Sequence, residues 1–189
     1  MSGIKEYQNW GADMIVEGLW VGSFTSSMNV SVIEAHDITH IINCSHELPC
    51  RFTDRFNYLH IKLYDQTHQN IINAFPHAIS FINNAHQNKG SVLIHCANGS
   101  SRSGSIAIAF LLSKNWNAKE KHQDVLHETI AFVQTKRPKI QPNPGFLEQL
   151  TLFQKWGCKL PSELTLDQQK QLKFYRLQAE ILLIKKSAN

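Results

Sequence analysis

Long apolar runs and signal-like segments are missing from this sequence of 189 residues. No window approaches the about 18 uninterrupted apolar residues that a membrane-spanning helix needs, so we expect no transmembrane segment. The first residues, MSGIKEYQNWGAD, also lack the apolar stretch of a secretory signal. We therefore expect an intracellular protein that resides in the cytoplasm, with the nucleus as the alternative.

Paired cysteines and runs of like charge are missing as well. The four cysteines (Cys44, Cys50, Cys96 and Cys158) never form a CxxC motif, which argues against a zinc site and against a disulfide framework. Lys and Arg number 19 and Asp and Glu 15, which gives a net charge of only +4 with neutral histidines. No run of about five or more like charges occurs, so we expect no nucleic-acid partner.

Apolar residues make up 42% of the chain, which is enough to bury a core. Their spacing alternates between strand and helix periods, which predicts an α/β fold with a central, mainly parallel sheet flanked by helices. The expected strands are Ile15–Gly22 (a strand pair, or a strand and a turn), Ile38–Cys44, Tyr58–Leu63 and Ser91–His95. The expected helices are Thr25–Ala35, a helix within Asn70–Asn88 that begins or bends near Pro76, Gly104–Ser113, Ala118–Thr135, Phe146–Trp156 and Leu164–Lys186.

The segment SVLIHCANGSSRS, residues 91–103, carries the strongest chemical signal. An apolar strand delivers Cys96 to the edge of the predicted sheet, and a helix starts near Arg102 or Ser103. Inward-facing N–H groups at a helix N-terminus form a cradle for an anion, and Gly99 lets the loop curl tightly. The N–H groups of this loop belong to Ala97, Asn98, Gly99, Ser100, Ser101 and Arg102.

Such a cradle favours the ionised, nucleophilic form of Cys96. Arg102 returns six residues later and places a planar fork of donors where the oxygens of a tetrahedral oxyanion lie. A thiolate and a phosphate cradle in one loop predict phosphoryl transfer through a phosphocysteine. The alternative is a buried cysteine at a strand end with a solvated arginine.

The loop HCANGSSRS resembles the signature loop of cysteine-dependent protein tyrosine phosphatases, in particular of small, atypical dual-specificity phosphatases. LWVG and ITHIINC resemble the N-terminal strands of that family, LYDQTHQNI its acid loop, and PNPGFLEQL its closing helix. The resemblance implies a catalytic domain at residues 13–157, after a segment of residues 1–12 and before a helical extension of residues 158–189. It also implies metal-independent hydrolysis of phosphotyrosine and phosphoserine or phosphothreonine in phosphoproteins, without a cofactor.

The same resemblance implies roles for individual residues. Asp65 matches the general acid, and a carboxyl group there could donate a proton in one step and activate water in the next. Ser103 matches the hydroxyl that stabilises the departing thiolate. Asp65 or Ser103 could instead cap a helix, and Asp54 is the runner-up acid. We expect His95 to hydrogen-bond to the loop and tune the thiol, and Asn143 to brace neighbouring loops or to occupy a simple turn.

Cys44 ends a strand that we expect beside the one ending at Cys96, so the two sulfur atoms could approach each other. Some relatives protect an oxidised nucleophile by a disulfide from such a position, and an activated thiolate is what peroxide oxidises first. Cys44 is therefore a candidate redox partner of Cys96. The alternative is a small apolar core residue.

The substrate and the C-terminal segment leave alternatives open. The loop residues ANGSS contain no lysine, which disfavours a highly charged inositol phosphate. A phosphatase of RNA 5′ ends, sugars or lipids and a non-catalytic module that binds phosphorylated residues are the other functions considered. The wide apolar face of Leu164–Lys186 must be covered by its own domain, by a homodimer or partner contact, or by a membrane surface.

Overall fold

The computed structural model describes residues 10–115, 125–159, 164–171 and 173. Its centre is a five-stranded sheet with the order β1-β2-β5-β3-β4. β1 pairs antiparallel with β2, and every other pairing is parallel, which confirms the predicted mainly parallel sheet. The strands are β1 (Ala12–Val16), β2 (Leu19–Gly22), β3 (Ile38–Asn43), β4 (Asn57–His60) and β5 (Ser91–His95).

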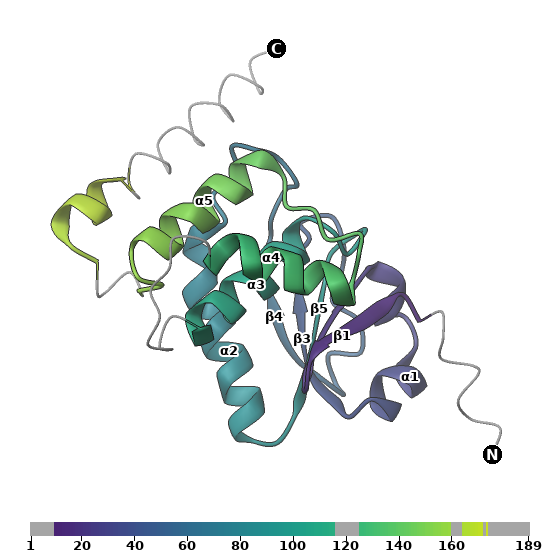
Figure 1. The fold of residues 1–189 in the computed structure, drawn as a ribbon. Helices are drawn as coiled ribbons and strands as arrows, with labels where there is room; N and C mark the ends of the chain where they lie inside the picture. The colour runs from purple at the N-terminus through teal and green to yellow at the C-terminus, as the bar shows by residue number, and fades with distance from the viewer. Residues whose placement is uncertain (1–9, 116–124, 160–163, 172, 174–189) are drawn as a thin grey trace, which may run out of the picture.

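Helices cover both faces of this sheet. Figure 1 shows α2, α3, α4 and α5 together on one side and α1 on the other. The helical elements are the 3-10 turn η1 (Phe24–Ser27), α1 (Val30–Ala35), the 3-10 turn η2 (Ile72–Ala74), α2 (Phe75–Gln87), α3 (Arg102–Asn115), α4 (Val125–Lys136) and α5 (Pro144–Lys155). The predicted layers of helix, sheet and helix are therefore confirmed.

The central strand β5 is buried on both faces. Val92 and Ile94 belong to the large cluster that packs against α2–α5, whereas Leu93 belongs to the smaller cluster on the side of α1. Successive side chains of a strand point to opposite faces, so an almost wholly apolar strand fits only between two helix layers. This burial fixes the position of the residues that follow His95.

The structure differs from the prediction where polar side chains form hydrogen bonds with the nearby backbone. The predicted helix Thr25–Ala35 is confirmed only in its second half, because the chain forms the 3-10 turn η1 first and α1 afterwards. In η1, the Ser26 and Ser27 hydroxyls donate to backbone carbonyls, and the Asn29 side chain then caps α1 by accepting from the N–H of Val32. Serine and asparagine favour caps and turns because their side chains compete for backbone hydrogen bonds.

Other elements also begin or end at residues that differ from the prediction. β4 ends at His60 rather than at Leu63, and the freed residues form a loop that leads to the predicted acid. α5 begins at Pro144 rather than at Phe146, because Asn143 caps it. The described part of α4, Val125–Lys136, agrees with the predicted helix Ala118–Thr135, and residues 118–124 of that prediction lie outside the described residues. α2 begins at Phe75, with Pro76 in its first turn as expected.

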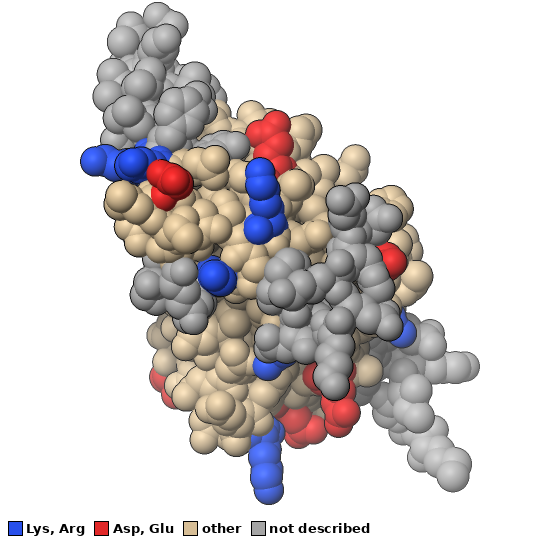
Figure 2. Space-filling model, turned by 60° about the vertical axis from the view of Figure 1, so that its left-hand side comes forward, with Lys and Arg blue, Asp and Glu red and all other residues tan. Residues whose placement is uncertain are grey.

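Only part of the C-terminal segment is described. Leu164 is 7% exposed and joins the cluster that packs against α2–α5, and residues 166–171 are helical. Most of the predicted helix Leu164–Lys186 lies outside the described residues. Within the described ranges, no helix is both long and apolar enough to cross a membrane. On the face shown in Figure 2, acidic and basic side chains are interspersed, in keeping with the modest net charge of +4.

Candidate active site

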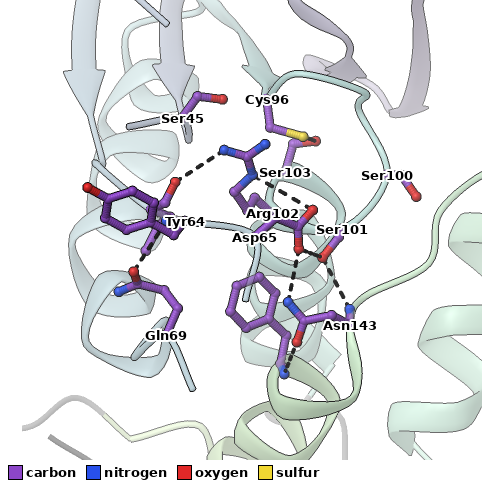
Figure 3. Close-up of polar contacts among 12 residues, drawn as sticks. Ser45, Tyr64, Asp65, Gln69, Cys96, Ser100, Ser101, Arg102, Ser103 and Asn143 are labelled. Carbon is purple, nitrogen blue, oxygen red and sulfur yellow. Dashed lines mark hydrogen bonds and ion pairs between the residues drawn. The ribbon is translucent and has the colours of Figure 1, made fainter. Parts of the chain in front are cut away.

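Cys96 lies directly after the central strand β5, and it is 1% exposed. Its sulfur accepts a hydrogen bond from the backbone N–H of Gly99 at 3.2 Å. The hydroxyl of Ser103 lies 3.2 Å from the same sulfur (Figure 3). The sulfur is thus held inside the loop of residues 97–102 by a backbone donor and a side-chain hydroxyl.

The loop curls because Gly99 occupies a conformation that only glycine adopts readily. Its φ angle is +66°, in the left-handed region. A Cβ atom at this position would lie 2.5 Å from the backbone of Gly22 at the end of β2, so there is also no space for a side chain. The backbone N–H of Phe24 donates to the carbonyl of Ala97 at 3.1 Å and ties the loop to η1. The predicted tight turn at Gly99 is confirmed.

α3 begins at Arg102, immediately behind the loop, as predicted. Its first turn includes a hydrogen bond from the N–H of Ser105 to the carbonyl of Ser101 at 2.8 Å. Ser103 therefore lies inside the helix, and its fully buried hydroxyl faces the sulfur of Cys96 rather than capping the helix. The N-terminus of this 14-residue helix points at the cradle and adds positive potential there.

Arg102 is not a solvated arginine, since it is only 5% exposed. Its Nη1 donates to both carboxylate oxygens of Glu47 at 2.8 Å and to the backbone carbonyl of Leu63 at 3.1 Å. Its Nε lies 3.9 Å from Oδ2 of Asp65. The structure thereby excludes the alternative of a buried cysteine beside a solvated arginine.

Asp65 lies across the loop from Cys96, held by one of its two oxygens (Figure 3). Its Oδ1 accepts hydrogen bonds from the Ser101 hydroxyl at 2.7 Å and from the Asn143 amide at 2.9 Å. Its side chain remains 38% exposed. Asp65 is therefore bound to the loop and does not cap a helix, whereas Asp54 is an exposed residue of the segment before β4.

Asn143 performs two tasks at once. Its Oδ1 accepts from the N–H of Phe146 at 3.0 Å and caps α5, while its Nδ2 donates to Asp65. Its backbone N–H donates to the Ser101 hydroxyl at 3.1 Å. Asn143 thus braces the loops around the site, as one of the two sequence-based expectations held, and it also orients the predicted acid.

His95 is completely buried beneath the loop. Burial lowers its pKa to about 4, and an interaction with the backbone of Cys96 acts in the opposite direction with a smaller effect. The ring is therefore neutral near pH 7 and places no positive charge beside the sulfur. The backbone of Cys96, where the loop begins, is the group that interacts with the ring, so a hydrogen bond of the His95 side chain to the loop stays a prediction.

Cys44 follows β3, the neighbour of β5, and it is fully buried. Its backbone N–H donates to the carbonyl of His95 at 2.8 Å. Burial raises the pKa of the Cys44 thiol well above its ordinary value, and a smaller effect in the same direction comes from Cys96. Both cysteines are free thiols in this structure, so their disulfide stays a prediction.

Sequence reasoning missed several residues that support the site. Arg137 is 2% exposed; it donates through Nε to the carbonyl of Gly99 at 2.7 Å and pairs with Asp13. Gln149 donates to the carbonyl of Gln69 at 2.9 Å, which steadies the segment after the acid. The missed contacts of Glu47 with Arg102 bridge 55 positions of sequence, and no local spacing pattern reveals pairs so distant.

A family model described as "Dual specificity phosphatase, catalytic domain" matches residues 19–156 of this chain. The chain belongs to this family. The matched residues include every side chain described above at this candidate site except Asp13. The resemblance inferred from the loop HCANGSSRS is therefore confirmed at the level of the family.

Individual relatives of this dual-specificity phosphatase domain share about a third of its residues. Dual specificity protein phosphatase 1 of Arabidopsis thaliana is 33% identical over 75% of this chain and 68% of its own length. Dual specificity protein phosphatase 19 of Mus musculus is 34% identical over 77% of this chain and 65% of its own length. The crystal structure of the human tyrosine phosphatase-like serine/threonine/tyrosine-interacting protein matches with a TM-score of 0.68 and 31% identity, over 76% of this chain and 95% of that one.

Proposed function

We propose that this protein is a metal-independent phosphatase that hydrolyses phosphotyrosine and phosphoserine or phosphothreonine in phosphoproteins through a phosphocysteine. The observation that carries this proposal is the joint placement of three groups. The sulfur of Cys96 lies inside a loop of backbone N–H groups, with the guanidinium of Arg102 and the carboxyl of Asp65 beside it. A nucleophile, an oxyanion-binding group and a proton donor are what phosphoryl transfer to a thiolate needs.

In the first step, the thiolate of Cys96 attacks phosphorus and the bond to the leaving oxygen breaks. The loop N–H groups and Arg102 stabilise the charge on the three equatorial oxygens. Asp65 donates its proton to the leaving oxygen. Because Oδ1 already accepts two hydrogen bonds, we assign the transferred proton to Oδ2.

In the second step, water attacks the phosphocysteine and the bond between sulfur and phosphorus breaks. Asp65, now a carboxylate, takes a proton from that water and is regenerated as an acid. The departing thiolate accepts a hydrogen bond from the Ser103 hydroxyl, which lies 3.2 Å from the sulfur. Products are the dephosphorylated residue and inorganic phosphate, and the enzyme returns to its starting state.

The charges around the site favour a single phosphoryl group over a polyanion. Arg102 and the exposed Lys139, whose carbonyl accepts from the Ser100 hydroxyl, are balanced by Glu47 and Asp65. An inositol polyphosphate would need several further cations, and ANGSS in the loop supplies none. Phosphates of RNA 5′ ends, sugars or lipids share the same chemistry, so they belong in the substrate panel.

The experiment is hydrolysis of a small aryl phosphate, with EDTA present, followed by profiling of phosphopeptides and non-protein phosphates. Cys96→Ser abolishes turnover, and Asp65→Asn lowers kcat by about 10²- to 10⁴-fold, the usual contribution of a general acid. Asp54→Asn, which removes an exposed aspartate of the same half of the chain, is the matched control and retains activity. A folded wild type that binds tungstate yet hydrolyses nothing would instead identify a non-catalytic module.

A further inference from the structure

The guanidinium of Arg102 is anchored at one end. Nη1 carries two N–H bonds, and three acceptors surround it: both oxygens of Glu47 at 2.8 Å and the carbonyl of Leu63 at 3.1 Å. Both hydrogens of Nη1 are therefore already committed. This end of the side chain has no donor left for a substrate.

The other end of the same group is unbonded. Nε is buried and has no hydrogen-bond partner among the described residues. The nearest carboxylate, that of Asp65, stays 3.9 Å away, which is too long for a hydrogen bond. Buried donors are normally paired, so an orphaned N–H beside an oxyanion loop indicates an acceptor that arrives with the ligand.

The carboxylate of Glu47 is electrostatically unfavourable beside a site that binds phosphate. A carboxylate near the pocket repels a dianion, and by charge alone it weakens binding. Its side chain is 47% exposed and could rotate into solvent, yet both of its oxygens contact Arg102. An arginine that must present a planar fork gains from such a second contact, because its long side chain otherwise samples many rotamers.

We propose that Glu47 is a positioning residue, which holds Nη1 of Arg102 so that the Nε edge faces the phosphoryl oxygens of the substrate. Glu47 does not touch the substrate itself. The inference rests on the proposed function for its kinetic consequence, but its consequence for oxyanion binding holds even without turnover. Positioning and simple charge repulsion predict effects of opposite sign when Glu47 is removed.

The test is the affinity of Glu47→Ala for tungstate, measured by calorimetry, together with vanadate inhibition and kcat/KM on an aryl phosphate. Positioning predicts that tungstate and vanadate bind about tenfold or more weakly, and that kcat/KM falls by about 10- to 100-fold, as small displacements of a catalytic group do. Tungstate binding that is unchanged or tighter overturns the proposal. Glu34→Ala is the matched control, because Glu34 also pairs with an arginine, Arg55, but on the surface at α1.

A thermal melt accompanies each variant, so that loss of folding is not mistaken for loss of positioning. If Glu47→Ala does not fold, Glu47→Met is judged by the same criterion, since it keeps a similar volume but offers Nη1 of Arg102 no carboxylate oxygen. A wild type without turnover would defeat the proposed function alone. The tungstate measurement would still decide the role of Glu47.

Discussion

Arg102 and Arg137 are both buried, and both contact the loop that holds Cys96, but they differ in how fully their nitrogen atoms are bonded. Arg137 donates through Nε to Gly99, through Nη1 to Asp13 and through Nη2 to the carbonyl of Gly11. Arg102 forms hydrogen bonds through Nη1 only, and its Nε, 3.9 Å from Asp65, has no hydrogen-bond partner within the described part of the chain. A saturated arginine stabilises the fold, whereas one with unused donors is prepared to bind a ligand.

The comparison of the two arginines predicts that Arg102→Lys has the largest effect, a loss of activity. A point charge cannot reproduce the planar fork, so kcat/KM on an aryl phosphate falls by about 10³-fold or more. The thermal midpoint falls less than it does for removal of the charge, because the lysine ammonium can still pair with Glu47. Steady-state kinetics and a melting curve check both parts, and a lysine variant within tenfold of wild type would contradict the assignment.

The next effect is expected for Arg137→Met, which keeps the length of the side chain and removes all its donors. The Gly99 carbonyl and Asp13 lose their partner, so the free energy of unfolding falls by about 3 kcal/mol. Urea denaturation measures this loss. If stability were unchanged while turnover disappeared, Arg137 would belong to the catalytic machinery and the comparison would fail.

His95, beneath the loop, makes stability depend on pH. Its pKa is about 4 in the folded protein against about 6.5 in the unfolded chain, so both states are neutral at high pH. As the pH falls from 6.5 towards 4, the unfolded state gains a proton first, and about 3 kcal/mol of stability is lost. The free energy of unfolding of His95→Asn, measured by denaturation, should therefore fall less steeply with decreasing pH over this range than that of the wild type. An equally steep fall would show that other groups are responsible.

The smallest effect concerns Cys44, because Cys44→Ala leaves turnover under reducing conditions essentially unchanged. After mild peroxide, the wild type should form a Cys44–Cys96 disulfide and recover with a thiol reductant. The variant should proceed to the irreversible sulfinic acid. Peptide mapping decides, and a wild-type Cys96 sulfinate without any crosslink would disprove the redox partnership.

The sequence predicted those parts of the molecule whose structure depends on residues close together in the chain. The buried strand Ser91–His95, the curl at Gly99 and the start of α3 all lie within a dozen consecutive residues, where periodicity and glycine are informative. The helix break before Asn29 could have been predicted from the run of serines, which favour turns over helix interiors. Two of the boundaries that differ, the starts of α1 and α5, lie where an asparagine side chain accepts a backbone hydrogen bond.

The supports of the site could not be predicted in the same way. Glu47 lies 55 positions from Arg102, Gln149 lies 80 positions from Gln69, and Arg137 lies 38 to 126 positions from its partners, so only the folded sheet and helices bring them together. Their residue types are ordinary for surface positions, and neither spacing nor composition distinguishes them. The role of Asn143 was half predicted, because the bracing of neighbouring loops was expected, whereas the cap on α5 and the contact with Asp65 were not.

The central claim is that catalysis passes through a phosphocysteine at residue 96. The most direct measurement is rapid quenching of Asp65→Ala with an aryl phosphate, followed by peptide mapping by mass spectrometry. An aryl leaving group departs without an acid, but water is not activated without the carboxylate, so the intermediate should accumulate on Cys96. A phosphoryl group found on Cys96 in stoichiometric amount is the predicted result. Turnover without any phosphorylated Cys96, or a phosphoryl group on another residue, would contradict the account.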